Sequence, residues 1–161
     1  MSSATAARIP RAAWTRAGVV LAVVLAADQL VKALVVGALE RGEERDLVLA
    51  IKLVNTRNSG VAFGQLQDGG VIVAVVIAIA VCALLVYFAR HAQVPLIWLP
   101  TGMLLGGALG NIVDRIREGA VIDFLKLPYW PAFNVADASI TIGVVVLLVV
   151  IERGERVRAR A

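Results

Sequence analysis

The residues best able to do chemistry in this sequence are aspartates that lie inside or beside long apolar segments. Asp28 and Lys32 are four residues apart within the first such segment, and Asp114 comes at the end of the third. A charge inside a membrane is energetically expensive, so each one is a candidate for function. The four-residue spacing puts Asp28 and Lys32 on one helix face, where an ion pair can form. That pair can serve an active site, or it can only stabilise a helix bundle.

Two further aspartates, Asp123 and Asp137, have the surroundings of a catalytic pair. Asp123 lies in a loop, within Val-Ile-Asp-Phe, and Asp137 lies near the start of the fourth apolar segment. Two carboxylates held close together cannot both ionise cheaply, so one of them keeps a proton. Such a pair can activate a water molecule and protonate a leaving amine, as peptide hydrolysis requires. The alternative for Asp137 is a buried ion pair with Arg115.

Several other polar residues can support such a pair. Asn58, Ser59 and Gly60 precede the second apolar segment, where they predict either a tight turn or a polar turn that binds an extended peptide. If the chain crosses a membrane four times, the ends of segments one and three and the starts of segments two and four meet on one side. The residues expected there beside Asp123 and Asp137 are Asp28, Lys32, Asn58, Gly60, Asn111, Asp114, Arg115 and Asn134.

Four apolar segments are long enough to position these residues, because a helix crosses a bilayer in roughly 20 residues. The expected spans are about 17–38, 70–89, 94–113 and 133–151, with outer loops at 39–69 and 114–132. Residues 47–55 are rich in β-branched side chains with partial alternation, which predicts a short extended pair or small sheet. The sequence therefore predicts a single membrane domain over 1–161. Its fold class is an all-α integral membrane protein, a four-transmembrane-helix bundle with a small extracytoplasmic β element.

The orientation follows from the basic residues, which are densest at the two ends of the chain and after the second segment. By the positive-inside tendency, both termini face the cytoplasm and the active site lies near the extracytoplasmic face. The net charge of +4 fits contact with membrane phospholipid and not with nucleic acid, because no basic stretch alternates with aromatic residues. The first segment could instead be a cleaved signal peptide, but it continues past Lys32 to full crossing length.

The chain has one histidine, His91, and one cysteine, Cys82. These counts exclude an intrachain disulfide and a zinc site built from several His and Cys residues, and we expect neither metal nor cofactor. Cys82 has no base in reach, so we expect it to serve packing. Three other classes stay open on the residues alone: a small transporter or proton channel, a non-enzymatic membrane adaptor, and an intramembrane serine protease with a lysine base.

The motifs, taken in order, resemble those of lipoprotein signal peptidase, the type II signal peptidase of bacteria. They are Asp28-Gln29 with Lys32, Asn58-x-Gly60-x-Ala62-Phe63, Gly107-x-x-Gly110-Asn111-x-x-Asp114-Arg115, Val121-x-Asp123-Phe124 and Phe133-Asn134-x-Ala136-Asp137. The resemblance implies an aspartic endopeptidase of the bacterial plasma (inner) membrane. It implies removal of signal peptides from diacylglyceryl-modified prolipoproteins by cleavage before the lipidated cysteine, with Asp123 and Asp137 as the catalytic pair. We expect a multi-pass monomer whose partners are lipid-modified prolipoprotein substrates.

Overall fold

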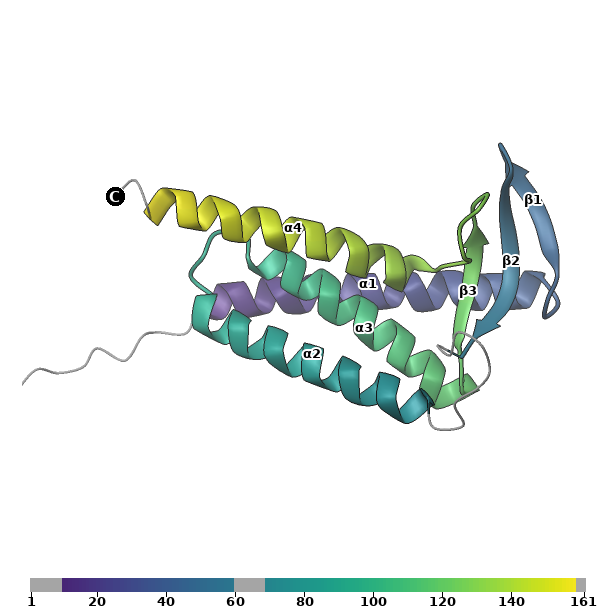
Figure 1. Cartoon of the computed structure of the whole chain (residues 1–161), viewed down its shortest axis with the longest axis horizontal. Coiled ribbons are helices and arrows are strands. Elements are labelled where there is room, and N and C mark those ends of the chain that lie inside the picture. Colours follow the sequence, from purple (N-terminus) through teal and green to yellow (C-terminus); the bar gives the residue numbers. More distant parts are fainter. Residues whose placement is uncertain (1–9, 60–68, 159–161) are drawn as a thin grey trace, which may run out of the picture.

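The computed structural model describes residues 10–59 and 69–158, and these form four helices and one small sheet (Figure 1). The helices are α1 (Arg11–Ala38), α2 (Gly69–His91), α3 (Trp98–Glu118) and α4 (Val135–Arg158), and the strands are β1 (Glu44–Val48), β2 (Ile51–Asn58) and β3 (Val121–Lys126). The expectation of a mostly helical chain with a small β element is confirmed.

The helices form an elongated bundle in which α3 packs against the three others (Figure 1). Glycines allow its closest approaches. A Cβ atom on Gly102 would lie 2.6 Å from the carbonyl oxygen of Ala17 in α1, and one on Gly107 would lie 2.6 Å from that of Ala136 in α4. Only a residue without a side chain fits there. The helix α3 therefore packs closely against both α1 and α4.

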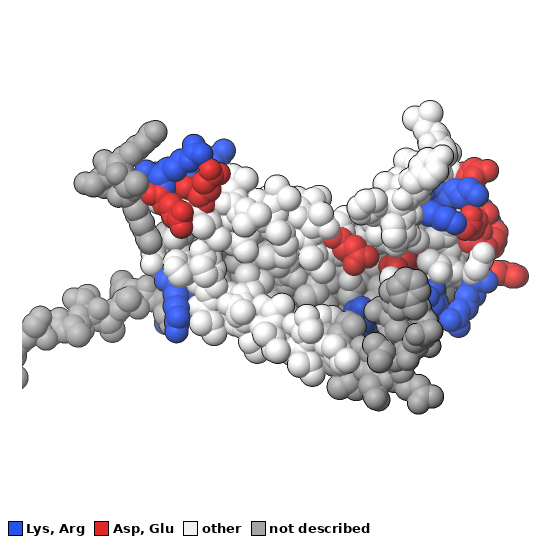
Figure 2. Space-filling model, viewed as in Figure 1, with Lys and Arg blue, Asp and Glu red and all other residues white. Residues whose placement is uncertain are grey.

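Two helices in the described part of the chain are long and apolar enough to cross a membrane. They are Arg11–Ala38 and, within α4, Val135–Arg156. Charged side chains gather mainly at the two ends of the molecule, and the long flank seen in Figure 2 is almost uncharged between them. A third helix, α2, is apolar over Val75–His91 but shorter. Four membrane crossings therefore stay a prediction.

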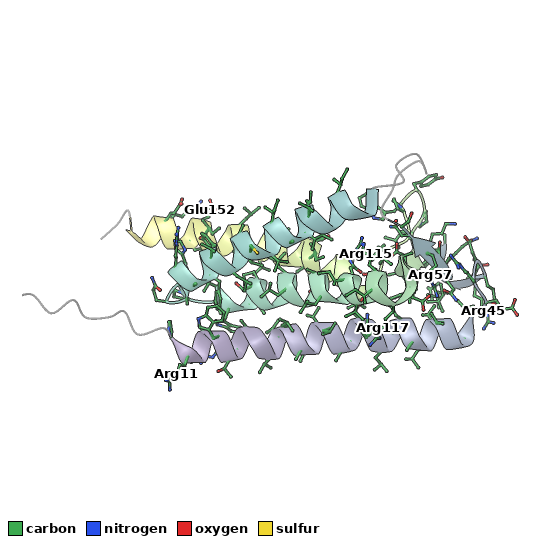
Figure 3. All side chains as sticks on the ribbon, turned by 90° about the horizontal axis from the view of Figure 1, so that it is seen from below. Arg11, Arg45, Arg57, Arg115, Arg117 and Glu152 are labelled. Atoms are coloured by element: carbon green, nitrogen blue, oxygen red, sulfur yellow. The ribbon has the colours of Figure 1, made fainter. Side chains whose placement is uncertain are left out.

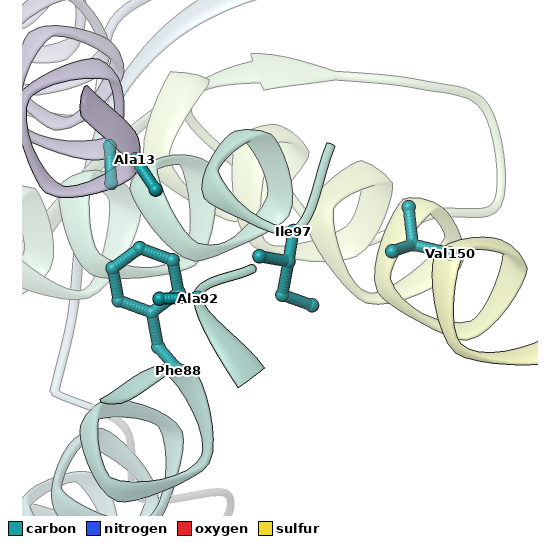
Figure 4. Packing of buried hydrophobic residues seen from close by; sticks show 6 residues of the cluster. Ala13, Phe88, Ala92, Ile97 and Val150 are labelled. Carbon is teal, nitrogen blue, oxygen red and sulfur yellow. The ribbon is translucent and has the colours of Figure 1, made fainter. Parts of the chain in front are cut away.

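The end of the bundle that carries the first residues of α1 and the last of α4 is held by a compact apolar cluster. Ala13 of α1, Phe88 and Ala92 of α2, Ile97 before α3 and Val150 of α4 are all buried there (Figure 4). The Trp14 ring meets that of Phe88 edge-on, with centroids 4.7 Å apart. This contact closes the end of the bundle that is opposite to the sheet.

The sheet lies at the other end, with its strands running across the helix axes in the order β1-β2-β3, all antiparallel (Figure 1). The pair β1–β2 confirms the extended element expected over residues 47–55. Phe124 of β3 packs on Val35 and Leu39 at the end of α1, which fixes the sheet to the bundle. The Asn55 side chain also donates to the Leu39 carbonyl oxygen, at 2.8 Å.

Two local expectations were wrong. Residues 121–126 were expected to belong to a flexible loop, but they form β3, which pairs with β2 and is buried over its first four residues. The third helix begins at Trp98 instead of near Val94, and it continues to Glu118, where Gly119 ends it in a left-handed conformation. Asn111 and Asp114 therefore lie within a helix and have fixed directions.

Candidate active site

Asp123 is held on β3 with its side chain withdrawn from solvent, at 1% exposure. Its Oδ1 accepts a hydrogen bond from Asn134 Nδ2 at 2.7 Å, and its Oδ2 accepts one from Asn58 Nδ2 at 3.0 Å. Burial raises the pKa of Asp123 to about 6, and the nearby charge of Asp137 acts in the same direction, whereas the two amide donors and Lys32 oppose the rise. Asp123 therefore holds a proton far more strongly than an ordinary aspartate.

Asp137 is the third residue of α4 and is half-buried. Asn134 caps this helix, because its Oδ1 accepts the Asp137 backbone N–H at 2.8 Å while Asp137 Oδ2 accepts the Asn134 N–H at 3.3 Å. This is a reciprocal capping box in which aspartate takes the place usually filled by glutamate. The other oxygen, Oδ1, accepts from Asn111 Nδ2 at 2.8 Å. The start of α4 thus fixes the direction of the Asp137 carboxylate.

Asn134 joins the two aspartates directly. Its amide nitrogen donates to Asp123, and its amide oxygen and backbone N–H form the capping box with Asp137. Asn134 Nδ2 also approaches Asn111 Oδ1 at 3.1 Å. Shared partners therefore position both carboxylates. The carboxylate of Asp123 is buried, and that of Asp137 is half-buried.

A charge cluster lies beneath this pair. The Lys32 ammonium is 2% exposed and lies 2.7 Å from Asp28 Oδ2 and 2.7 Å from Asp114 Oδ2. The predicted Asp28–Lys32 ion pair is present, and a second carboxylate shares its cation. Lys32 Nζ also donates to Asn111 Oδ1 at 3.2 Å. Since an ammonium has no acceptor, this bond makes Asn111 present its Nδ2 to Asp137.

The two outer carboxylates of the cluster each reach the backbone beside a candidate catalytic residue. Asp28 Oδ1 accepts the N–H of Ala136 at 2.9 Å, and Asp114 Oδ2 accepts the N–H of Ile122 at 3.1 Å. Ala136 precedes Asp137, and Ile122 precedes Asp123. The cluster therefore anchors both chain segments that carry the pair.

Arg115 lies at the end of α3 without the ion pair considered for it. Arg115 donates to the Asn111 carbonyl oxygen at 3.2 Å, and among the described residues it forms no ion pair with Asp137, which was the alternative considered for that aspartate. Figure 3 shows Arg115 near the sheet end of the bundle. Gly60 lies outside the described residues. Asn58, at the end of β2, is exposed but reaches Asp123 as stated above.

One contributor was missed. Gln29 Nε2 donates to Asp114 Oδ1 at 2.9 Å and to the Gly110 carbonyl oxygen at 3.3 Å, and Gln29 Oε1 accepts from Arg117 at 3.3 Å. Gln29 belongs to the Asp28-Gln29 motif, but it was not among the residues expected in the site. Gly110 also has a role in the site, since a Cβ there would lie 2.5 Å from Asp28 Oδ2. The only signal in the sequence for Gln29 was its place next to the helix face that carries Asp28 and Lys32.

An apolar groove of about 580 Å³ runs along α2, α3 and α4 towards the pair. Ile140, one turn after Asp137, and Ala108, one turn before Asn111, both line it. Among the described residues, no group of three or more His, Cys, Asp or Glu side chains is placed to hold a metal ion.

Known proteins resemble this chain in sequence and in fold. Residues 20–152 match the model of a family described as Signal peptidase (SPase) II. A lipoprotein signal peptidase of Halothermothrix orenii is 35% identical over 140 residues, covering 86% of this chain and 97% of that protein. One of Brevibacillus brevis is 40% identical over 133 residues, covering 80% and 89%. A solved bacterial membrane enzyme aligns with a TM-score of 0.77 at 28% identity, over 84% of this chain and 91% of the other.

Proposed function

The chain belongs to the signal peptidase II family, and from this premise we propose that it is a membrane aspartic endopeptidase acting on prolipoproteins. It removes signal peptides from diacylglyceryl-modified precursors by cleaving before the lipidated cysteine. Its relatives are named lipoprotein signal peptidases, and they match over most of their own length. The catalytic pair is Asp123 and Asp137.

The observation that carries this assignment is the joint positioning of two unequal carboxylates by Asn134. Asp123 is buried and has its pKa raised to about 6, whereas Asp137 is half-buried, one helical turn before Ile140 of the groove. Because the pKa of Asp123 is about 6, the pair can hold one proton and one negative charge in slightly acid solution. We assign the proton to Asp123 and the charge to Asp137.

The reaction follows from those protonation states. Asp137 takes a proton from a water molecule, and the oxygen of that water attacks the carbonyl carbon of the scissile bond. Asp123 gives its proton to the carbonyl oxygen, and a tetrahedral intermediate forms. When the carbon–nitrogen bond breaks, the proton on Asp137 passes to the leaving amine and Asp123 regains its own.

The remaining site residues position the pair and do not transfer protons. Asn111 and Asn134 orient Asp137, Asn58 orients Asp123, and the amides cannot ionise near neutral pH. Asp28, Lys32 and Asp114 hold the adjoining backbone. Arg115 carries a permanent charge at this end of α3, and we assign it to the binding of the peptide substrate, together with Gly60.

We propose that all four helices cross the bacterial plasma membrane, with both termini in the cytoplasm and the sheet outside. In that orientation, the pair lies near the extracytoplasmic surface. The groove between α2, α3 and α4 includes Ile140, one turn after Asp137, and its lining suits the apolar part of a lipid-modified precursor. Because the site is built within one chain, a monomer suffices.

The test is cleavage of a diacylglyceryl-modified precursor by purified Asp123→Asn and Asp137→Asn variants. Each variant keeps the size of the side chain but removes its acid function, so each should lose at least about 10²-fold to 10⁴-fold in rate, the usual contribution of general acid–base catalysis. Asp46→Asn, on the exposed strand β1, is the matched control and should cleave at the parent rate. A folded Asp137→Asn enzyme that cleaves near the parent rate would refute the pair.

A further inference from the structure

The sheet carries large apolar side chains that neither fold nor active site explains. Leu49 in the turn between β1 and β2 is 90% exposed, and Tyr129 in the turn after β3 is fully exposed. Their neighbours Val48 and Trp130 are also largely exposed, at 66% and 65%. We call these four residues the apolar rim. Tyr129 and Trp130 line a hollow of about 580 Å³, and Ala50, the residue after Leu49, lines it from the hairpin.

The backbone makes two of these residues harder to explain. Val48 pairs with Ile51, so Leu49 and Ala50 form a two-residue hairpin turn, with φ of 50° and 65°. Such turns favour Asn and Gly, because a side chain is strained at positive φ. Tyr129 has φ of 61° as well. At both turns a large apolar residue replaces a better turn former, yet it is not buried in the protein.

The rim lies where a membrane surface would meet the sheet. The strands run across the helix axes, so the hairpin tip projects sideways from the end of the bundle (Figure 1). The turn that carries Tyr129 and Trp130 leads into α4, which is apolar enough to span a membrane and exposes Ile142, Val145 and Leu148 on its outside. Figure 2 shows an uncharged surface on the part of the sheet that overhangs the bundle. The rim therefore continues the apolar flank of the helices.

The charges beside the rim fit phospholipid headgroups. Lys52 and Lys126 line the same hollow, and both pair with a single acid, Glu44, at 3.1 and 2.6 Å. Asp46, the cross-strand partner of Lys52, adds a second acid, so two ammonium groups and two carboxylates lie together here, as in a zwitterionic surface. An aromatic and aliphatic edge next to basic side chains is typical of segments at a membrane interface.

We propose that the apolar rim inserts into the outer leaflet and that lipid is its partner, so that the sheet carrying Asp123 rests on the bilayer. The inserted rim fixes the distance of the sheet from the hydrocarbon region on the side of α4. This assignment rests on the proposed orientation of the chain in the membrane and is independent of the proposed peptidase activity.

The test measures the depth of nitroxide labels in the full chain, reconstituted in vesicles of phosphatidylethanolamine and phosphatidylglycerol. Leu49→Cys and Tyr129→Cys are made in a Cys82→Ala background and labelled singly. Arg45→Cys is the control, because its side chain is 59% exposed and lies at the far end of the sheet (Figure 3). We expect labels at 49 and 129 to be relaxed more by oxygen than by a soluble nickel chelate, and the label at 45 to show the reverse order.

A second variant tests whether the rim acts as one surface. Leu49→Asn suits the turn conformation, since Asn tolerates positive φ, and it removes the apolar side chain. In this background, the label at 129 should move towards water. Labels at 49 and 129 that both prefer the nickel chelate would overturn the proposal. Spin–spin broadening between copies would also overturn it, because the partner would then be a second chain.

Discussion

Replacing Asp123 by asparagine should change how the stability of the protein depends on pH. Burial raises the pKa of this carboxyl from 3.8 to about 6 in the folded chain. The folded state therefore binds the proton more tightly than the unfolded state does. The resulting stabilisation is complete below about pH 3.8 and is lost as the pH rises through about 6.

The shift sets the size of the effect. At about 1.4 kcal/mol per pH unit, the parent protein should lose at most about 3 kcal/mol of stability from this group between acid and neutral pH. The Asp123→Asn variant has no proton to lose, so this decline disappears. In the variant, the amide oxygen of residue 123 can accept from Asn134, but the amide nitrogen then faces the donor Asn58 Nδ2. The loss of that hydrogen bond lowers the stability by the same amount at every pH. The pH dependence therefore isolates the proton.

The assay is unfolding of the purified chain in mixed micelles by a denaturing detergent, followed by circular dichroism between about pH 4 and about pH 8. Thr56→Ser is the control, because Thr56 is the cross-strand partner of Asp123 and does not titrate in this range. The difference in unfolding free energy between variant and parent should shift in favour of the variant as the pH rises. Parallel curves for the variant and the parent would refute the assignment of a raised proton affinity to Asp123.

Three further outcomes are expected from the packing around the pair. Lys32→Met leaves two buried carboxylates without their cation and should destabilise the fold by about 3–5 kcal/mol. Adding Asp28→Asn should restore part of the lost stability, which detergent unfolding would measure. Gly110→Ala pushes a methyl group against Asp28 and should cost about 1–3 kcal/mol, whereas Gly18→Ala in open space on α1 should stabilise the chain slightly. No recovery in the first case, or equal effects in the second, would contradict the geometry. Cys82→Ala should cleave substrate normally and thiol reagents should not inhibit, because Cys82 is exposed on α2 away from the pair; loss of activity in both would reopen a cysteine mechanism.

The positions of the charged residues inside apolar segments could be predicted from the sequence, because these segments can only be helices. A helix brings Asp28 and Lys32 to one face, and the observed 2.7 Å contact agrees. Asp137 was expected near the start of a helix, and it lies in the first turn of α4. In both places the helical repeat alone determines the geometry.

The long-range pairing of β3 could not be predicted in this way. Residues Val121–Lys126 have no clean alternation, and their strand exists because it pairs with β2, some 65 residues earlier, and packs on the end of α1. Cys82 was expected to serve packing, but it is exposed on the outside of the bundle. Hydropathy does not tell which face of a uniformly apolar helix meets a neighbouring helix and which meets lipid.

The double role of Asn134, as helix cap and as bridge between the carboxylates, orders the assembly of the protein during synthesis. Asp28, Lys32, Asp114 and Asp123 leave the ribosome before α4, but Asp137 cannot be oriented until that last helix has formed its first turn. The same turn supplies the Ala136 N–H that Asp28 binds. A nascent chain still lacking α4 would therefore hold Asp123 without its proposed partner, and docking of the final helix would complete the proposed pair.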